Sequence, residues 1–395
     1  MTATAIDSSM TFNYIKKTED ANQLATYKKM PLAVERGQGS WVWTSAGEKY
    51  LDLYGGHAVC GTGHSHPHVV KAIKEQAERV LFYSNLVYSD IRARAAAKLV
   101  SLAPDELTKA FFCSSGTEAN ENAMRMARMA TGRQKIVSFS GGFHGRTADS
   151  ISATFLGKYR KLGEPNVPHH FEAEFGSIES IRAVIDGDTA GVIVEPIQSM
   201  AGVREAPAGF FSELRSVCEQ HGAVLIFDEV QTGVGRVGSW FFAGSEFAGG
   251  VVPDVVTLAK SLGSGVPVGA CLVNDRVSSE IRENDLGTTF GGGMIAMAAV
   301  LATLEAIEAD GMIENAANAE AYLRKALEEV KGVAAVHGKG CLVGIEFDGP
   351  CLPVYARLLE QKIITGTSSN PAVLRLLPPL CVTQEELATF VEAIG

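Results

Sequence analysis

The sequence predicts an α/β protein of 395 residues, built on a mostly parallel central sheet that is covered by helices. Three observations support this prediction. Short apolar runs without polar alternation recur through the middle of the chain, as is typical of strands buried on both faces. Apolar residues at helical spacing separate several of these runs. After Phe290 the pattern changes to short strands and helices in mixed order, which predicts a smaller α+β domain.

The elements are expected in the following order. A hairpin is expected at 39–44 and 49–54, around the turn Ser45-Ala-Gly-Glu, and is followed by helices at 68–80 and 90–102. The buried strands are expected at 110–113, 135–139, 190–195, 223–228, 255–258 and 268–273, with helices at 117–130 and 209–221 between them. Further helices are expected at 294–309, 312–330, 352–361 and from Thr383, and further strands at 333–336, 341–347 and 373–376.

These patterns divide the chain into three predicted parts. Residues 1–62 form an N-terminal segment whose hairpin is expected to pack with the small domain. Residues 63–293 form the large domain, and residues 294–395 form the small α+β domain.

Composition and charge exclude several classes of protein. The 35 basic and 45 acidic residues give a net charge of −10, and no cluster of Lys and Arg is present, which argues against a nucleic-acid partner. The seven cysteines are scattered without a C-x-x-C pair, as expected in a reducing compartment. No long apolar span and no signal peptide are visible. We therefore expect a cytoplasmic protein with no membrane partner.

Glycine is enriched, at 41 residues, and gathers in short turns next to apolar runs. Examples are Tyr54-Gly-Gly-His, Ser140-Gly-Gly-Phe and Leu262-Gly-Ser-Gly. Because glycine lets the backbone approach a ligand closely, loops of this kind indicate an enzyme.

Two ionisable residues follow buried strands. Asp228 ends an apolar run, and Lys260 stands between another apolar run and a glycine-rich loop. Taken alone, Asp228 is better explained by capping of a turn, and Lys260 is equally well explained by a surface or ion-paired lysine. Together they match the needs of pyridoxal phosphate, which binds a lysine amine as a Schiff base and requires an acid to keep its pyridine nitrogen protonated.

A phosphate-binding site is predicted at the start of the helix at 117–130. Ser115, Gly116 and Thr117 follow the strand at 110–113, and backbone N–H groups at a helix N-terminus bind phosphate well. The alternative is an ordinary capping box, since a glutamate follows Ser115 three residues later. The combination with Asp228 and Lys260 favours the phosphate site.

Four further residues are candidates for contacts with cofactor or substrate. Phe143 could stack on a pyridine ring, and Arg146 could hold a carboxylate through two hydrogen bonds. A core phenylalanine and a surface arginine are the plainer alternatives. Arg375 lies inside an apolar run, where arginine is usually paired or functional, and Glu195, at the end of the strand at 190–195, could be its partner.

Three histidines at alternate positions resemble a metal site. His64, His66 and His68 would share one side of an extended segment, but no Cys or carboxylate motif accompanies them. Pro67 is better explained as the first residue of the following helix. We expect no metal.

Taken together, these residues resemble the class III, fold-type I pyridoxal-phosphate aminotransferases, and most of all the acetylornithine aminotransferase family. The matching motifs run almost end to end: Tyr50-Leu-Asp, Gly63-His-x-His-Pro, Ser115-Gly-Thr-Glu-Ala-Asn, Phe143-His-Gly-Arg-Thr, Glu195-Pro-x-Gln, Asp228-Glu-Val-Gln-Thr-Gly-x-Gly-Arg, Leu258-Ala-Lys and Thr288-Thr-Phe-Gly-Gly. The resemblance implies a seven-stranded central sheet, in a large domain that binds pyridoxal 5'-phosphate.

The resemblance also implies roles for single residues. Lys260 would bind the cofactor covalently and move the proton, and Asp228 would pair with the pyridine nitrogen. The other cofactor contacts would be Ser115, Gly116, Thr117, Phe143, Gln231 and, from the neighbouring subunit of a homodimer, Thr289. The substrate contacts would be Thr288, Arg146 for the distal carboxylate, Arg375 for the α-carboxylate, and Glu195, which would mask Arg375 when the substrate has no carboxylate there.

The sequence departs from the family pattern at three places. Glu195-Pro-x-Gln usually continues with Gly-Glu-Gly-Gly and here continues with Ser199-Met200-Ala201-Gly202. Gly293-Met294 stands where Asn-Pro is usual, and Ser114 where Asn is common. We expect these changes to affect the choice of substrate and not the chemistry.

The implied activity is transfer of the side-chain amine of an N2-acylated ornithine, with N2-acetylornithine first, to 2-oxoglutarate in arginine biosynthesis. The alternatives of the same class are 4-aminobutyrate, free ornithine, and a succinylornithine or acyl-lysine donor. An aminomutase, epimerase or decarboxylase would not need both Arg146 and Arg375. A catalytically inert scaffold would not need Lys260 and Asp228.

Overall fold

A seven-stranded sheet lies at the centre of the structure, a computed structural model that describes residues 11–395. Its strands, in spatial order, are β4 (Leu107–Cys113), β12 (Gly269–Asn274), β11 (Val255–Leu258), β10 (Val224–Asp228), β7 (Thr189–Val194), β5 (Lys135–Phe139) and β6 (His170–Ala173). β12 runs antiparallel to both of its neighbours, and the other neighbouring strands are parallel. The predicted mostly parallel sheet is confirmed.

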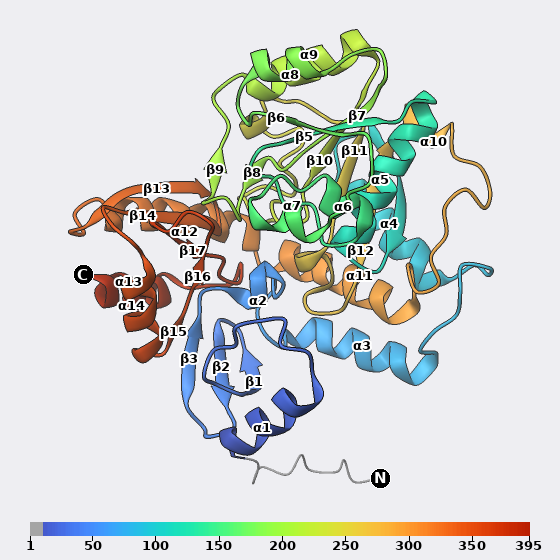
Figure 1. Cartoon of the computed structure of the whole chain (residues 1–395). Helices are drawn as coiled ribbons and strands as arrows, with labels where there is room; N and C mark the ends of the chain where they lie inside the picture. The colour runs from blue at the N-terminus through green and yellow to red at the C-terminus, as the bar shows by residue number, and fades with distance from the viewer. Residues whose placement is uncertain (1–10) are drawn as a thin grey trace.

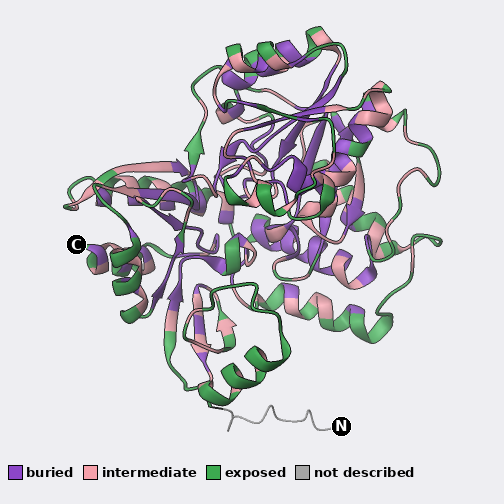
Figure 2. Cartoon of the chain, in the orientation of Figure 1, coloured by how far each residue is buried: buried purple, intermediate pink, exposed green. Residues whose placement is uncertain are grey.

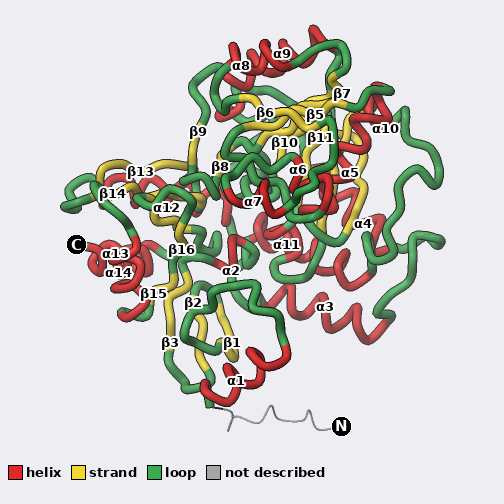
Figure 3. The backbone as a smooth tube through the Cα atoms, in the orientation of Figure 1, coloured by secondary structure: helices red, strands yellow, loops and turns green. Residues whose placement is uncertain are grey.

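Helices cover both faces of this sheet (Figure 3). In β10, Val224 and Ile226 pack in the same apolar cluster as the helix α5 (Gly116–Thr131). Leu225 and Phe227 pack in the cluster that includes the helix α9 (Phe210–His221). Successive side chains of a strand point to opposite faces, so a strand between two helical layers is apolar at every position. Figure 2 shows the resulting buried centre.

The edge strand β6 was not predicted from the sequence. Its outer residues His170 and Ala173 are buried, whereas Phe171 and Glu172 between them are exposed. It therefore lacks the continuous apolar run by which the other strands were recognised.

Shorter elements connect the strands of the central sheet. They are α6 (Ala148–Ser152), α7 (Lys158–Leu162), α8 (Ile178–Val184), β8 (Ile197–Gln198), β9 (Arg204–Glu205), α10 (Asp275–Ser278) and the 3₁₀ helices Glu246–Ala248 and Lys260–Gly263. Before the sheet come α2 (Gly55–Ala58), α3 (Pro67–Arg79) and α4 (Asp90–Ser101). The helix α11 (Met294–Ala309) packs against α3, α4 and the 3₁₀ helix at Lys260.

The two ends of the described chain share a sheet. After α1 (Phe12–Asn22), the strands β1 (Val34–Gln38), β2 (Trp41–Thr44) and β3 (Lys49–Asp52) pair antiparallel, and β3 pairs in parallel with β15 (Ile363–Ile364) (Figure 1). This pairing joins the N-terminal hairpin to a strand of the C-terminal part. The first ten residues of the predicted segment 1–62 lie outside the described residues, and the domain boundaries stay a prediction.

The C-terminal part contains a second antiparallel sheet. Its strands, in spatial order, are β13 (Val333–Lys339), β14 (Leu342–Phe347), β17 (Val373–Leu376) and β16 (Gly366–Thr367). The accompanying helices are α12 (Met312–Leu327), α13 (Leu352–Glu360) and α14 (Gln384–Ile394). Across residues 11–395, no helix is long and apolar enough to span a bilayer.

Glu386 joins this C-terminal part to the N-terminal hairpin. Its side chain closes a capping box with Thr383 at the start of α14 and accepts a hydrogen bond from Trp41 Nε1 at 2.5 Å. Its neighbour Glu385 is exposed and lies in the same first turn, and its side chain forms no hydrogen bond or ion pair within residues 11–395.

We expect Glu386→Ala to lower the free energy of unfolding by about 1–2 kcal/mol, because a cap and a partly buried hydrogen bond are both lost. Glu385→Ala removes the same charge from the same helix turn and should cost less than about 0.5 kcal/mol. Urea unfolding of the two variants measures the difference, and equal losses would contradict the role given to Glu386.

Candidate active site

A cavity of about 560 Å³ lies at the carboxyl ends of the central strands. Residues at or just beyond the ends of β4, β7, β10 and β11 line it, at the edge where open α/β sheets bind ligands. The cavity brings together most of the residues singled out in the sequence: Ser115, Gly116, Thr117, Phe143, Arg146, Glu195, Asp228, Gln231, Lys260 and Arg375.

Asp228 is held in place by three hydrogen bonds. Its Oδ2 accepts from His144 Nδ1 at 2.8 Å and from Asn120 Nδ2 at 2.7 Å, and its Oδ1 accepts from Val230 N at 3.1 Å. Asn120 is oriented in turn by Thr257, whose hydroxyl donates to Asn120 Oδ1 at 2.6 Å. These bonds offset the cost of burying the carboxylate and fix its direction.

His144 and Asn120 were not predicted as site residues. His144 lies inside the motif Phe143-His-Gly-Arg, and Asn120 lies about one turn beyond Gly116 on α5. Both residues belong to motifs that were recognised in the sequence. Their common contact with Asp228 could not be recognised there, because it depends on how the strands of the sheet are arranged.

Lys260 lines the same cavity in a strained backbone conformation. Its φ of 46° is in the left-handed region, which is costly for a residue other than glycine. Desolvation lowers the pKa of its amine below the usual value, although the nearby carboxylates of Asp228 and Glu195 oppose that shift. A lowered pKa makes an amine a better nucleophile toward a carbonyl carbon.

The first turn of α5 leaves two backbone donors free. Ser115 Oγ accepts from Glu118 N at 3.3 Å, and Glu118 Oε2 accepts from Ser114 N at 2.8 Å, so the capping interaction is real. The N–H groups of Gly116 and Thr117 have no hydrogen-bond partner among residues 11–395. They are the donors that an anion such as phosphate would occupy.

The glycine of this turn is required by close packing. A Cβ on Gly116 would lie 2.8 Å from Val230 Cγ1 and 3.3 Å from Ala259 Cβ. The turn is thereby pressed against the loops that carry Asp228 and Lys260, which places the anion-binding donors beside both.

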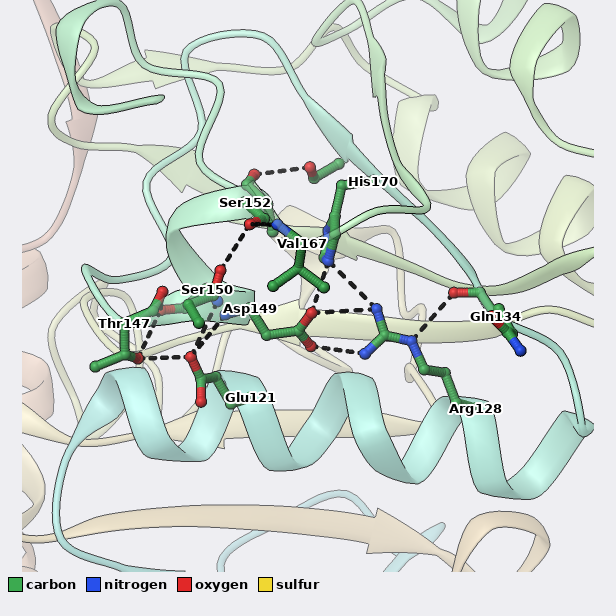
Figure 4. A network of polar contacts seen from close by, with 12 residues as sticks. Glu121, Arg128, Gln134, Thr147, Asp149, Ser150, Ser152, Val167 and His170 are labelled. Atoms are coloured by element: carbon green, nitrogen blue, oxygen red, sulfur yellow. Dashed lines mark hydrogen bonds and ion pairs between the residues drawn. The ribbon is translucent and has the colours of Figure 1, made fainter. Parts of the chain in front are cut away.

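A network of hydroxyl groups and a carboxylate joins α5 to α6 (Figure 4). Thr117 Oγ1 contacts Thr147 Oγ1 at 2.8 Å and Ser150 Oγ at 2.6 Å. Glu121 Oε1 accepts from Thr147 Oγ1, from Asp149 N and from Ser150 N, which caps the start of α6. The segment that precedes α6 and carries Phe143 and Arg146 is thereby fixed to the anion-binding turn.

Arg146 is exposed at the mouth of the cavity and faces two aromatic rings. Its guanidinium lies 4.9 Å from the ring centre of Tyr159 and 5.7 Å from that of Tyr27. The ring of Phe143 meets Tyr159 edge to face at 5.5 Å. Arg146 forms no ion pair within residues 11–395, so its guanidinium is available to a carboxylate.

Arg375 is buried and held by uncharged groups. Its Nε donates to Thr367 O at 2.8 Å, its Nη1 to Ser199 Oγ at 3.0 Å and its Nη2 to Tyr54 OH at 2.7 Å. The suggested ion pair with Glu195 is not formed, since Glu195 Oε1 accepts instead from the backbone N–H of Phe143 at 2.7 Å. Burial raises the pKa of Glu195 to about 7.

Two of the expected site residues lie outside this cavity. Thr289 is exposed and Thr288 is half-buried, and neither lines the cavity of its own chain. The three histidines at 64, 66 and 68 each contact a different carboxylate, on Asp52, Asp310 and Glu305. No cluster of metal-ligating side chains is found in the described part of the chain.

The residues present fit pyridoxal phosphate. The cavity has an amine of lowered pKa, an oriented carboxylate and two free backbone donors at a helix N-terminus. When bound, this cofactor supplies an aldehyde for amines and an electron-withdrawing ring.

Comparison with known proteins supports the same conclusion. The family model described as aminotransferase class-III matches residues 23–395. Similar proteins include the acetylornithine aminotransferase of Methanopyrus kandleri, 42% identical over 93% of this chain and 94% of that protein, and that of Bacillus subtilis, 39% identical over 93% and 95%.

Solved structures agree. The ornithine aminotransferase of Toxoplasma gondii is 25% identical with a TM-score of 0.90, covering 98% of this chain and 94% of that one. The acetylornithine aminotransferase of Elizabethkingia anophelis is 27% identical with a TM-score of 0.84 and 98% coverage of both chains. The chain therefore belongs to the class-III aminotransferase family and is a pyridoxal-phosphate-dependent transaminase.

Proposed function

We propose that this enzyme transfers the side-chain amine of an N2-acylated ornithine, with N2-acetylornithine as first choice, to 2-oxoglutarate. The products are the corresponding semialdehyde and glutamate, and the reaction belongs to arginine biosynthesis in the cytoplasm. The observation that carries this proposal is that one cavity holds two arginines, Arg146 and Arg375, together with Lys260. A dicarboxylate such as 2-oxoglutarate needs a cation at each end.

The residues of the cavity have distinct roles in this proposal. The amine of Lys260 holds the cofactor between turnovers and moves a proton at the substrate carbon. Asp228, fixed by His144 and Asn120, keeps a proton on the ring nitrogen. The N–H groups of Gly116 and Thr117 bind the phosphate, and Ser115 caps the turn that presents them.

The remaining contacts complete the site. Phe143 would stack on the cofactor ring and Gln231 would contact the ring hydroxyl, since both line the cavity. Arg146 binds the carboxylate far from the reacting carbon, and Arg375 binds the α-carboxylate of glutamate or 2-oxoglutarate. Glu195 lines the same cavity as Arg375 and would pair with it when the substrate leaves that guanidinium free.

The amine donor distinguishes this proposal from its alternatives. The acetylornithine aminotransferase of Methanopyrus kandleri is 42% identical to this chain, which favours an acylated ornithine. Free ornithine is the second candidate, because the ornithine aminotransferase of Toxoplasma gondii has the same fold. The donors 4-aminobutyrate, succinylornithine and an acyl-lysine remain outcomes of the test below.

A homodimer is part of the proposal, because an apolar surface lies uncovered beside Thr289. The loop 80–88 exposes Leu81, Leu86 and Tyr88, and Leu86 is 91% exposed. It is attached to the loop of Thr289 through the ring pair of Phe82 and Phe290 and through Asn85, which donates to Gly291 O at 2.9 Å. A second copy would cover this surface and bring Thr288 and Thr289 to the neighbouring cavity.

The substrate is tested by half-reactions on purified, cofactor-loaded protein. N2-acetylornithine, N2-succinylornithine, ornithine, 4-aminobutyrate and glutamate are each added without an acceptor, and the loss of the cofactor's visible band is timed. We expect fast loss with glutamate and with one acylated ornithine. Fast loss with glutamate and 4-aminobutyrate would contradict the proposed donor, and no loss with any amine would contradict aminotransfer.

We expect Arg375→Ala to slow the glutamate half-reaction by about 10²-fold or more, since a buried contact to a carboxylate is lost. The half-reaction with N2-acetylornithine, which places no carboxylate there, should change far less. Single-turnover kinetics with each amine measure the two losses. Equal losses would show that Arg375 does not bind the α-carboxylate.

Shared active sites predict complementation between two inactive chains. Lys260→Ala removes the reacting amine, and Thr289→Asp places a carboxylate against the phosphate of the neighbouring site. Their mixed dimer has one intact site, so co-expression should restore about a quarter of wild-type activity if the chains pair at random.

The control for this experiment pairs Lys260→Ala with the double variant Lys260→Ala/Thr289→Asp. That mixture holds no intact site in any dimer and should stay inactive. If the first mixture is equally inactive although both chains co-purify, Thr289 does not act across an interface.

A further inference from the structure

All three guanidinium nitrogens of Arg375 donate hydrogen bonds to groups that carry no charge. The carbonyl of Thr367, the hydroxyl of Tyr54 and the hydroxyl of Ser199 each accept one of its hydrogen bonds, and only 3% of the residue is exposed. A buried guanidinium usually has a carboxylate partner. Here its charge remains unbalanced, so an incoming carboxylate binds without first displacing an ion pair.

The carboxylate that could pair with Arg375 is occupied elsewhere. Glu195 is also buried and accepts a 2.7 Å hydrogen bond from Phe143 N. Both residues line the same cavity, and each influences the pKa of other groups in it. The position of the guanidinium therefore depends on a competition between Glu195 and the neutral groups that now hold it.

Ser199 is the neutral partner that departs from the usual family motif. It stands directly after Glu195-Pro-Ile-Gln, where the family pattern has a glycine, which has no hydroxyl to offer. The side chain of Ser199 is fully buried, and Arg375 is the partner that the structure gives to its hydroxyl.

The backbone around Ser199 is anchored on both sides. Its carbonyl accepts from the N–H groups of Gly202 and Val203, which closes a tight turn after β8. The next carbonyl, of Met200, accepts from Ser369 N at 2.9 Å, in the segment between β16 and β17. The hydroxyl is thus presented to Arg375 from a fixed position.

We infer that Ser199 is a positioning residue that holds the Arg375 guanidinium away from Glu195 and ready for the α-carboxylate of 2-oxoglutarate or glutamate. This inference rests on the proposed function, in which Arg375 binds that carboxylate. The inference predicts that the two half-reactions respond differently to loss of the Ser199 hydroxyl. Loss of the hydroxyl weakens the half-reaction that uses a dicarboxylate and spares the half-reaction that uses an acylated ornithine.

The test compares Ser199→Ala with wild type in two measurements. The dissociation constant of glutarate, an unreactive dicarboxylate of the same chain length as 2-oxoglutarate, is measured by calorimetry on the holoenzyme. The KM for 2-oxoglutarate and the rate of the N2-acetylornithine half-reaction are measured separately. We expect the first two constants to rise about threefold to tenfold, as for loss of one hydrogen bond, and the half-reaction rate to change less than twofold.

Four further variants isolate the cause. Ser199→Thr keeps the hydroxyl and should retain wild-type glutarate affinity. Ser138→Ala removes another buried hydroxyl, which lies in β5 and donates to Ala153 O, and should leave the ratio of the two half-reactions unchanged. Ser199→Ala/Glu195→Gln removes the competitor as well and should recover glutarate affinity to within about twofold of Glu195→Gln alone.

The outcomes separate the role inferred for Ser199 from the proposed role of Arg375, on which it rests. Equal losses in both half-reactions, or a double variant as weak as the sum of its parts, would overturn the role of Ser199. If Ser199→Ala does not fold, Ser199→Gly, which restores the residue of the family pattern, takes its place. If Arg375→Ala itself leaves glutarate binding unchanged, the proposed function of Arg375 fails, and that result is distinguishable from failure at Ser199.

Discussion

The site depends on the cost of placing charged groups at the buried end of a sheet. Asp228 lies at the end of a fully buried strand, where an unpaired carboxylate would be strongly destabilising. Hydrogen bonds from His144 and Asn120 offset this cost. Asn120 belongs to α5, the helix whose first turn offers free backbone donors. The same helix thus orients the acid and presents the anion-binding turn.

The two other buried charges of the cavity are kept apart. Glu195 is held by a backbone N–H group, and Arg375 by a carbonyl and two hydroxyl groups. An ion pair between them would stabilise both, but it would have to break each time a substrate carboxylate entered. Neutral partners leave the guanidinium charged and able to bind a substrate carboxylate. Ser199 is the partner that departs from the family pattern. One site can then accept a dicarboxylate and a monocarboxylate amine in alternate half-reactions.

Much of the fold could be predicted because the central strands are buried on both faces and therefore apolar throughout. The strand β6 could not, since its two middle residues are exposed at the edge of the sheet. The short strands β8, β9, β15 and β16 have only two residues each, too few for any periodicity to show.

The site was predictable where a residue type is unusual in its local sequence, as for Lys260 before a glycine-rich loop and Arg375 in an apolar run. Tyr54, Asn120 and Ser199 are ordinary in their local sequence. Their contacts join residues 108 to 321 positions apart in the chain, so only the folded arrangement reveals them. The expected pairing of Glu195 with Arg375 was not found for the same reason, because local sequence says nothing of the competing hydroxyl groups.

The most direct test of this account is a crystal structure of the cofactor-loaded chain with glutarate bound. The account predicts the phosphate on the N–H groups of Gly116 and Thr117, and Asp228 in contact with the pyridine nitrogen. One glutarate carboxylate should lie on Arg375 while Ser199 still contacts that guanidinium. A phosphate bound elsewhere, or a glutarate carboxylate that leaves Arg375 paired with Glu195, would contradict it.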